Sequence, residues 1–212
     1  MRTSELIAAL AADPVPEPVR LGRRVAAAIV LGLIGSLAIY ALFLGPRPDI
    51  AEAGRTVRFG LKFVDAFAFA LPSLLLMLRL ARPDAKPGAL AFWLLLPFLL
   101  LSAGVAVELL VVPSNQWLSR LIGQHAMFCT RMIPLMAAPL LAALIVALRA
   151  GAPLHPALTG ALAGAASAGI AALLYASHCP DDSPLFVATW YPLATLICAG
   201  AGALAGRRFL AW

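Results

Sequence analysis

Thiols and imidazoles occur in pairs at two places in this chain. Cys129 follows His125 by four residues, and Cys179 directly follows His178. Residues four apart lie on one face of a helix, so the first pair would project together. Two thiols and two imidazoles form the ligand set of a tetrahedral zinc-type site, although neither pair has the spacing of a familiar zinc motif. Metal binding by these four residues is therefore one hypothesis, and it requires the two segments to meet.

The thiols also suggest redox chemistry. We predict that Cys129 and Cys179 both lie on the non-cytoplasmic side of a membrane, in a compartment that permits disulfides. A bridge between them would close a loop of roughly 50 residues and stabilise the fold by about 4 kcal/mol. A permanent structural disulfide and a redox-sensing pair both fit this spacing. The third thiol, Cys198, lies in a long apolar stretch and is expected to be a packing residue.

The composition predicts the membrane that these positions require. Of the 212 residues, 62% are hydrophobic and only 12% are charged, and the mean hydropathy is +0.93. A soluble domain carries about 25% charged residues. So much apolar surface cannot be buried inside a chain of this length unless lipid takes the place of water. The sequence therefore predicts an integral membrane protein.

Six apolar stretches have the length of about 17–25 residues that a membrane-spanning helix needs. We predict an all-α, polytopic fold, in which residues 25–212 form a bundle of six transmembrane helices. The first stretch is longer than the apolar core of a cleaved signal peptide, and no cleavage motif follows it, so it is expected to stay in the protein. The predicted spans are residues 25–44, 62–80, 88–112, 132–149, 156–177 and 185–206.

The basic residues predict the orientation of the bundle. If the N-terminus lies in the cytoplasm, the cytoplasmic segments hold ten of the 16 basic residues and the other side holds six. Cytoplasmic loops of membrane proteins carry such an excess. We therefore expect both termini in the cytoplasm. The net charge of +6 is then a topological signal rather than a nucleic-acid-binding patch, because the basic residues are dispersed at helix ends.

Residues 1–24 precede the first span and can act away from the bilayer. Leu6, Ile7 and Leu10 would lie on one face of a short helix that ends at Asp13, before three alternating prolines. So short a helix is unstable alone in water and needs a surface on which to fold. That surface is either the lipid headgroups or the groove of a cytoplasmic partner protein.

Ionisable residues are predicted only at the ends of the spans. Asp65 and Glu108 are expected near outer ends, as solvated acids or as partners of Arg58, Lys62, Arg120 or Arg131. An ion-coupled transporter needs such groups at the middle of the membrane, so this pattern disfavours a permease.

Small residues and prolines predict how the spans pack and bend. Gly160, Gly164 and Ala168 recur every four residues, as do Gly202 and Gly206, and such repeats favour close helix packing. Prolines within the predicted spans should kink them; these are Pro72, Pro97, Pro134, Pro139 and Pro192.

Several stretches resemble a known family. They are TSELIAALAADPVP at 3–16, CTRMIPLMAAPLLAALIVALRAGAP at 129–153, YASHCPDDSPLFVATWY at 175–191 and the closing GALAGRRFLAW. In these residues the chain resembles the NrsF-like membrane anti-sigma factors, six-span negative regulators of extracytoplasmic-function sigma factors. It departs from the pattern at Ala150, where a second basic residue often follows Arg149, and Cys198 lies outside the pattern.

The resemblance implies a partner, a location and a signal. It implies that Leu6, Ile7, Leu10 and Asp13 hold an extracytoplasmic-function sigma factor on the cytoplasmic side of a bacterial inner membrane. It also implies that Cys129 and Cys179 respond to oxidative or soft-metal stress and so trigger release. Such a protein is not an enzyme, carries no cofactor and does not contact nucleic acid directly.

Two alternatives come from other functional classes. A membrane thiol-disulfide oxidoreductase usually needs a second cysteine pair or a C-x-x-C motif, and the chain has neither. A small permease is disfavoured by the expected lack of charge at the membrane midplane.

Overall fold

A computed structural model describes residues 2–5, 7, 21–83 and 85–211. Within these ranges the secondary structure is entirely helical, and no strand is present. Thr3–Glu5 and Ile7 are helical, as the prediction of a short N-terminal helix requires. Leu6, Leu10 and Asp13, which the sequence places on that helix, lie outside the described residues.

In the described part of the chain, six helical segments are long and apolar enough to cross a membrane, which confirms the predicted fold class. Each predicted span corresponds to one of them, but three begin four or more residues earlier than predicted: α2 at Leu21 rather than 25, α4 at Val57 rather than 62, and α7 at Ala126 rather than 132. The long helices are α2 (Leu21–Phe43), α4 (Val57–Leu80), α5 (Leu96–Val111) with the preceding 3-10 helix η1 (Gly88–Leu95), α7 (Ala126–Leu148), α8 (Pro156–Ala176) and α9 (Pro184–Phe209).

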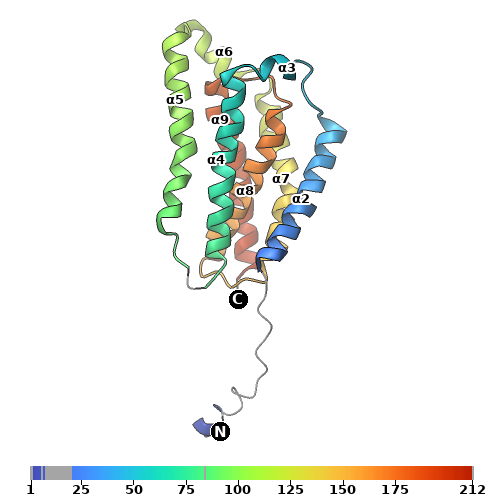
Figure 1. The fold of residues 1–212 in the computed structure, drawn as a ribbon, viewed down its shortest axis with the longest axis vertical. Helices are drawn as coiled ribbons and strands as arrows, with labels where there is room; N and C mark the ends of the chain where they lie inside the picture. The colour runs from blue at the N-terminus through green and yellow to red at the C-terminus, as the bar shows by residue number, and fades with distance from the viewer. Residues whose placement is uncertain (1, 6, 8–20, 84, 212) are drawn as a thin grey trace.

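Three short helices lie at the end of the bundle away from the chain termini (Figure 1). They are α3 (Ile50–Ala53), η2 (Ser114–Gln116) and α6 (Trp117–Ile122). The start of α2 and the end of α9 lie together at the opposite end, as an even number of spans requires. We call the end with the short helices the loop end and the other the terminal end.

The helix α8 lies at the centre and packs closely against α9 (Figure 1). A Cβ atom added at Gly160 would clash with the Gly202 carbonyl oxygen, and one at Gly164 would clash with the Cys198 carbonyl oxygen. Only a residue without a side chain permits such backbone contact between helices. The prediction that these small residues serve helix packing is confirmed.

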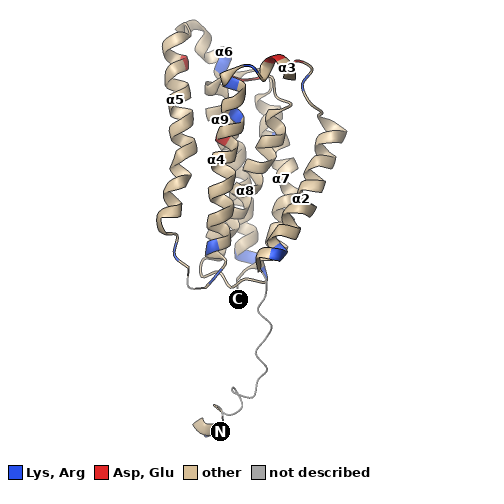
Figure 2. Cartoon of the chain, in the orientation of Figure 1, with Lys and Arg blue, Asp and Glu red and all other residues tan. Residues whose placement is uncertain are grey.

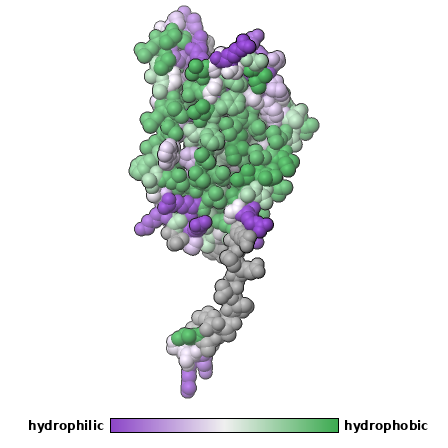
Figure 3. Space-filling model, viewed as in Figure 1, coloured by the Kyte–Doolittle hydropathy of each residue, from purple (hydrophilic) through white to green (hydrophobic). Residues whose placement is uncertain are grey.

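On the face that Figure 3 shows, an apolar belt lies between two polar ends of the bundle. Basic and acidic residues gather at the ends (Figure 2), whereas large apolar side chains such as Leu31, Leu110, Val146 and Leu196 are exposed along the sides. So large an apolar surface would be costly in water, and it matches the hydrocarbon core of a bilayer.

Four of the five prolines lie inside helices as predicted: Pro72 in α4, Pro134 and Pro139 in α7, and Pro192 in α9. Pro97 also lies within its predicted span, which η1 and α5 form together, but it occupies the first turn of α5, directly after the 3-10 helix η1. Proline is well tolerated there, because the amide that it lacks would have no partner within the helix.

The prediction for Asp65 was wrong. Because α4 begins at Val57, Asp65 lies about two turns inside the helix rather than at its end. It is 6% exposed and forms no ion pair with any described residue. Glu108 does pair with Arg120 at 3.1 Å and Arg58 at 3.8 Å, as predicted, although its side chain is buried rather than solvated.

Candidate functional site

Both predicted thiols lie in one buried cluster at the loop end. Cys129 is in the first turn of α7, and Cys179 is in the loop that joins α8 to α9. Both are fully buried, both are free, and both belong to the same apolar core. The two segments therefore meet, which the sequence alone could not establish. We call Cys129, Cys179, Tyr175 and Tyr191 the thiol cluster.

Aromatic rings surround the two thiols. Tyr175 is fully buried, with its ring centroid 6.2 Å from that of Tyr191 and 5.9 Å from that of His178. Among the described residues, neither tyrosine hydroxyl has a hydrogen-bond partner. The thiols are thus held in an apolar environment with few polar groups to stabilise a thiolate.

Burial determines the resting chemistry of the loop thiol. Burial raises the pKa of Cys179 above its ordinary value, and the nearby Lys62 ammonium opposes that rise only in part. At neutral pH the group is therefore a protonated thiol, which is a poor nucleophile and a poor metal ligand. Reaction of Cys179 requires the loop to open or a reagent to enter the core.

Two buried cations hold the loop of Cys179. The Asp182 carboxylate lies 2.6 Å from Lys62 Nζ and 2.8 Å from the Arg47 guanidinium. The same cations donate hydrogen bonds to the Cys179 carbonyl oxygen, at 2.9 Å from Lys62 and 3.3 Å from Arg47. Arg47 also pairs with Asp49 at 2.6 Å and holds the pKa of that carboxyl below its usual range. We call Arg47 and Lys62 the cationic clamp.

The clamp links three parts of the chain. Arg47 follows α2, Lys62 lies in α4, and both reach the loop between α8 and α9. Removing one partner of a buried ion pair leaves an uncompensated charge and is strongly destabilising. The clamp therefore fixes the position of Cys179 relative to α4 and to the end of α2.

Asp181 links the same loop to the start of α7. Its carboxylate accepts hydrogen bonds from the backbone amides of Gln124 and His125 at 3.0–3.2 Å and lies 3.3 Å from His125 Nδ1. His125 is one turn before Cys129. The loop that carries one thiol is thus bound to the segment that precedes the other.

The two imidazoles of the hypothetical metal site have other neighbours. His125 pairs with Asp181, and the Nδ1 atom of His178 lies 2.9 Å from the Gly45 carbonyl oxygen. In the described part of the chain, no three His, Cys, Asp or Glu residues are arranged to hold a metal ion. The structure brings Cys129 and Cys179 into one core and directs both imidazoles to partners outside it.

Glu108 organises the start of α9. It accepts a hydrogen bond from the Ser183 hydroxyl at 2.7 Å and another from the Leu185 amide at 3.1 Å. A carboxylate at a helix N-terminus satisfies free amides and interacts favourably with the helix dipole. Three acids, Glu108, Asp181 and Asp182, therefore shape the polypeptide around Cys179.

Sequence reasoning missed the cationic clamp. Arg47 was considered only as one of the six outer basic residues, and Lys62 was expected to pair with Asp65 or Glu108 rather than with Asp182. The available signal was charge complementarity, since the first outer loop carries four basic residues and the loop of Cys179 carries two adjacent acids.

Of the predicted partner-binding residues, only Ile7 is described. It is helical and 62% exposed, whereas Leu6, Leu10 and Asp13 lie outside the described ranges.

Comparison with known proteins agrees with the resemblance seen in the sequence. The family model described as "Negative regulator of sigma F" matches residues 10–212. The chain is 32% identical over 213 residues to the "Probable anti-sigma-F factor NrsF" of Azospira oryzae, and the match covers all of both chains. It is 33% identical over 223 residues to the "Anti-sigma-F factor NrsF" of Caulobacter vibrioides, again over all of both chains. No solved structure matches the chain. This chain belongs to the NrsF family of negative regulators of sigma F.

Proposed function

We propose that this chain is an anti-sigma factor of a bacterial inner membrane, with both termini in the cytoplasm. Its N-terminal segment holds an extracytoplasmic-function sigma factor, and chemistry at Cys129 and Cys179 causes release. Membership of the family supports the regulatory role. The observation that carries the sensing role is the presence of both free thiols in one core at the end of the bundle away from the termini.

The geometry of the terminal end favours a partner-binding segment. Ile7 presents a largely exposed apolar side chain on a helical stretch. Leu6 and Leu10 would share that face, and an isolated helix of this length gains stability only against another surface. Arg23, Arg24, Arg207 and Arg208 lie near the terminal end, as expected for the cytoplasmic side.

The proposed signal converts the two thiols to a cross-linked form. In oxidation, both S–H bonds break and one S–S bond forms, while two electrons and two protons reduce an oxidant of the peroxide class to water. In the metal-dependent form, both sulfurs bind one soft metal ion and release their two protons. Either product fixes the separation of the two sulfur atoms, and in our proposal the tyrosine rings around them repack to accommodate it.

The helix α2 connects the thiol cluster to the terminal end. Near the loop end, the Tyr40 hydroxyl lies 2.7 Å from Ser177 Oγ, two residues before Cys179. Along its length α2 packs on α7, which carries Cys129, and Ser36 Oγ donates to the Met136 carbonyl at 2.7 Å. At its other end α2 begins at Leu21, directly after the N-terminal segment.

These contacts define what the signal must change. A ligand or oxidant shifts an equilibrium only by its differential affinity for the two states. In our proposal, α2 packs on α7 and on the loop of Cys179 in the reduced state. The cross-linked state favours a different position of α2, and the N-terminal segment attached to α2 then binds the sigma factor less tightly.

The sigma-binding claim can be tested with the full-length protein in lipid nanodiscs. Extracytoplasmic-function sigma factors of the same organism are offered one at a time, and retention is measured. We expect one of them to be retained by the wild type and lost with Leu6→Asp combined with Leu10→Asp. Ala8→Asp adds a charge on the side of the predicted helix opposite the apolar face and should retain it. Binding that survives the double substitution would contradict the proposed role of this face.

A further inference from the structure

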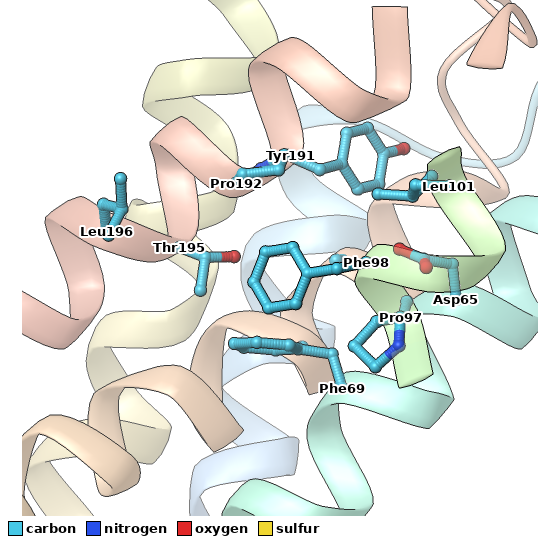
Figure 4. A pocket seen from close by; sticks show the side chains of 12 residues that line it. Asp65, Phe69, Pro97, Phe98, Leu101, Tyr191, Pro192, Thr195 and Leu196 are labelled. Atoms are coloured by element: carbon cyan, nitrogen blue, oxygen red, sulfur yellow. The ribbon is translucent and has the colours of Figure 1, made fainter. Parts of the chain in front are cut away.

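A cavity of about 140 Å³ lies between α4, α5, α8 and α9, and the proposed function does not use it. Aromatic and apolar side chains form most of its wall, including Phe69 of α4 and Phe98 and Leu101 of α5 (Figure 4). Phe98 is 52% exposed and Leu196 is 68% exposed, so these two residues also face the apolar outer surface of the bundle. The cavity is therefore reachable from the lipid phase.

One wall of the cavity carries a buried acid. Asp65 is 6% exposed, and its side chain points from α4 toward the other residues that line the cavity (Figure 4). Its Oδ1 atom has no hydrogen-bond partner among the described residues. An unpartnered buried polar atom costs roughly 1–3 kcal/mol, more when it is charged. So costly a group inside an apolar bundle calls for a partner in the cavity beside it.

Tyr191 adds a second polar group to the lining. It is 5% exposed, and its hydroxyl has no hydrogen-bond partner in the described part of the chain. Its ring packs at 6.2 Å from that of Tyr175. The cavity therefore adjoins the thiol cluster, and Tyr191 belongs to both.

The size and chemistry of the lining select the ligand. A cavity of about 150 Å³ in another protein accepts benzene, so this one accommodates a single six-membered aromatic ring. The rings of Phe69 and Phe98 offer aromatic contacts. A hydroxyl group on the ligand both donates and accepts, so it can pair with a carboxyl group in either protonation state. An amine would instead bring a positive charge into an apolar site, at a much greater cost of desolvation.

We propose that this cavity binds a hydroxylated aromatic ring that enters from the lipid, with Asp65 as the partner of the ring hydroxyl. The shared chemistry is that of a phenol. Its source is either the quinol head group of a membrane lipid or a lipophilic phenol from outside the cell. The open side toward Phe98 and Leu196 leaves room for a hydrocarbon tail to remain in the bilayer.

Binding can be measured with the full-length protein in nanodiscs by saturation-transfer NMR. The matched probes are para-cresol and toluene, which differ only by the hydroxyl group, together with a short-chain quinol. We expect saturable binding of para-cresol about tenfold tighter than that of toluene, as one good hydrogen bond provides. Quinol binding that competes with para-cresol points to the lipid source, and its absence points to an external phenol.

Two variants and a cross-link locate the site. Asp65→Leu should abolish the preference for para-cresol over toluene, whereas Asp65→Asn keeps an acceptor and should preserve most of it. If Asp65→Leu does not fold, a diazirine-bearing phenol on the wild type should label peptides from α4, α5, α8 and α9, and toluene should protect them poorly. Equal affinity of the wild type for both probes, an unchanged preference in Asp65→Leu, or labelling elsewhere would overturn the proposal.

Discussion

The Lys62 Nζ atom lies 2.6 Å from Asp182 Oδ1, and the same ammonium donates to the Cys179 carbonyl oxygen at 2.9 Å. One side chain of α4 therefore fixes both the acid and the thiol residue of the loop between α8 and α9. Lys62 itself is 1% exposed. The position of Cys179 therefore depends on this buried charge.

Replacement of Lys62 by Met should lower the stability of the reduced protein by about 2 kcal/mol. Breaking a buried ion pair costs about 3–5 kcal/mol. We expect a smaller loss here because Asp182 keeps its ion pair with Arg47 and remains partly exposed to solvent. The measurement is thermal unfolding in detergent micelles. Arg55→Met is the control, since Arg55 is exposed and has no ion pair with any described residue. Equal unfolding temperatures for both variants would show that the clamp does not stabilise the loop.

The raised pKa of Cys179 predicts how its labelling depends on pH. The native thiol should react with iodoacetamide much more slowly at pH 7 than an exposed cysteine does, and its rate should still rise above pH 9. Burial favours the neutral form in the folded state, whereas the unfolded thiol ionises near pH 8.5. The stability contributed by Cys179 is therefore full below about pH 8.5 and falls as the pH rises further.

Cys179→Ala should remove this loss of stability at high pH. Unfolding temperatures of the wild type and the variant, measured between pH 7 and pH 10, supply the comparison. Rapid labelling of the native wild type at pH 7 would contradict the buried, protonated thiol.

Removal of the Asp181 carboxylate should make the thiols easier to reach. Asp181→Ala deletes the hydrogen bonds that join the loop of Cys179 to Gln124 and His125. Loss of about 1.5 kcal/mol from the closed state would speed thiol labelling roughly tenfold at constant pH. Glu52→Ala, at an exposed acid of α3 without an ion pair to the described residues, should leave the rate unchanged. An identical rate in both variants would mean that Asp181 does not hold the loop closed.

Close packing of α8 on α9 predicts a large difference between two glycine substitutions. Gly164→Ala should destabilise the protein by about 1–3 kcal/mol, because the new Cβ would clash with the Cys198 backbone. Gly200→Ala is the matched control, since nothing lies within 4 Å of a Cβ at that position of α9. It should be neutral or slightly stabilising, because alanine is the better helix former. Thermal unfolding of the two variants distinguishes the outcomes.

Hydropathy predicted the existence of all six spans but not their full lengths. The apolar runs were bounded at charged residues such as Lys62 and Arg131, yet α4 and α7 continue through them because helical hydrogen bonding does not depend on side-chain polarity. Asp65 was misplaced for the same reason. Because the start of α4 was predicted five residues too late, a buried acid in a cavity wall was expected to be a surface acid.

The thiol cluster could be predicted only in part. The sequence predicted that Cys129 and Cys179 lie on the same side of the membrane, and their presence in one core agrees with this. It did not predict the tyrosines around them or the cationic clamp. These contacts arise from the rotation and tilt of helices that are apolar on all faces, and such helices carry no periodic pattern from which their rotation can be read.

The central claim is that chemistry at Cys129 and Cys179 controls release of the sigma factor. The direct measurement is dissociation of a bound sigma factor from the protein in nanodiscs after hydrogen peroxide is added on the side of the loop end. We predict release from the wild type and from Cys198→Ser, and retention when both Cys129 and Cys179 are replaced by Ser. Equal release from the double variant and the wild type would contradict the account.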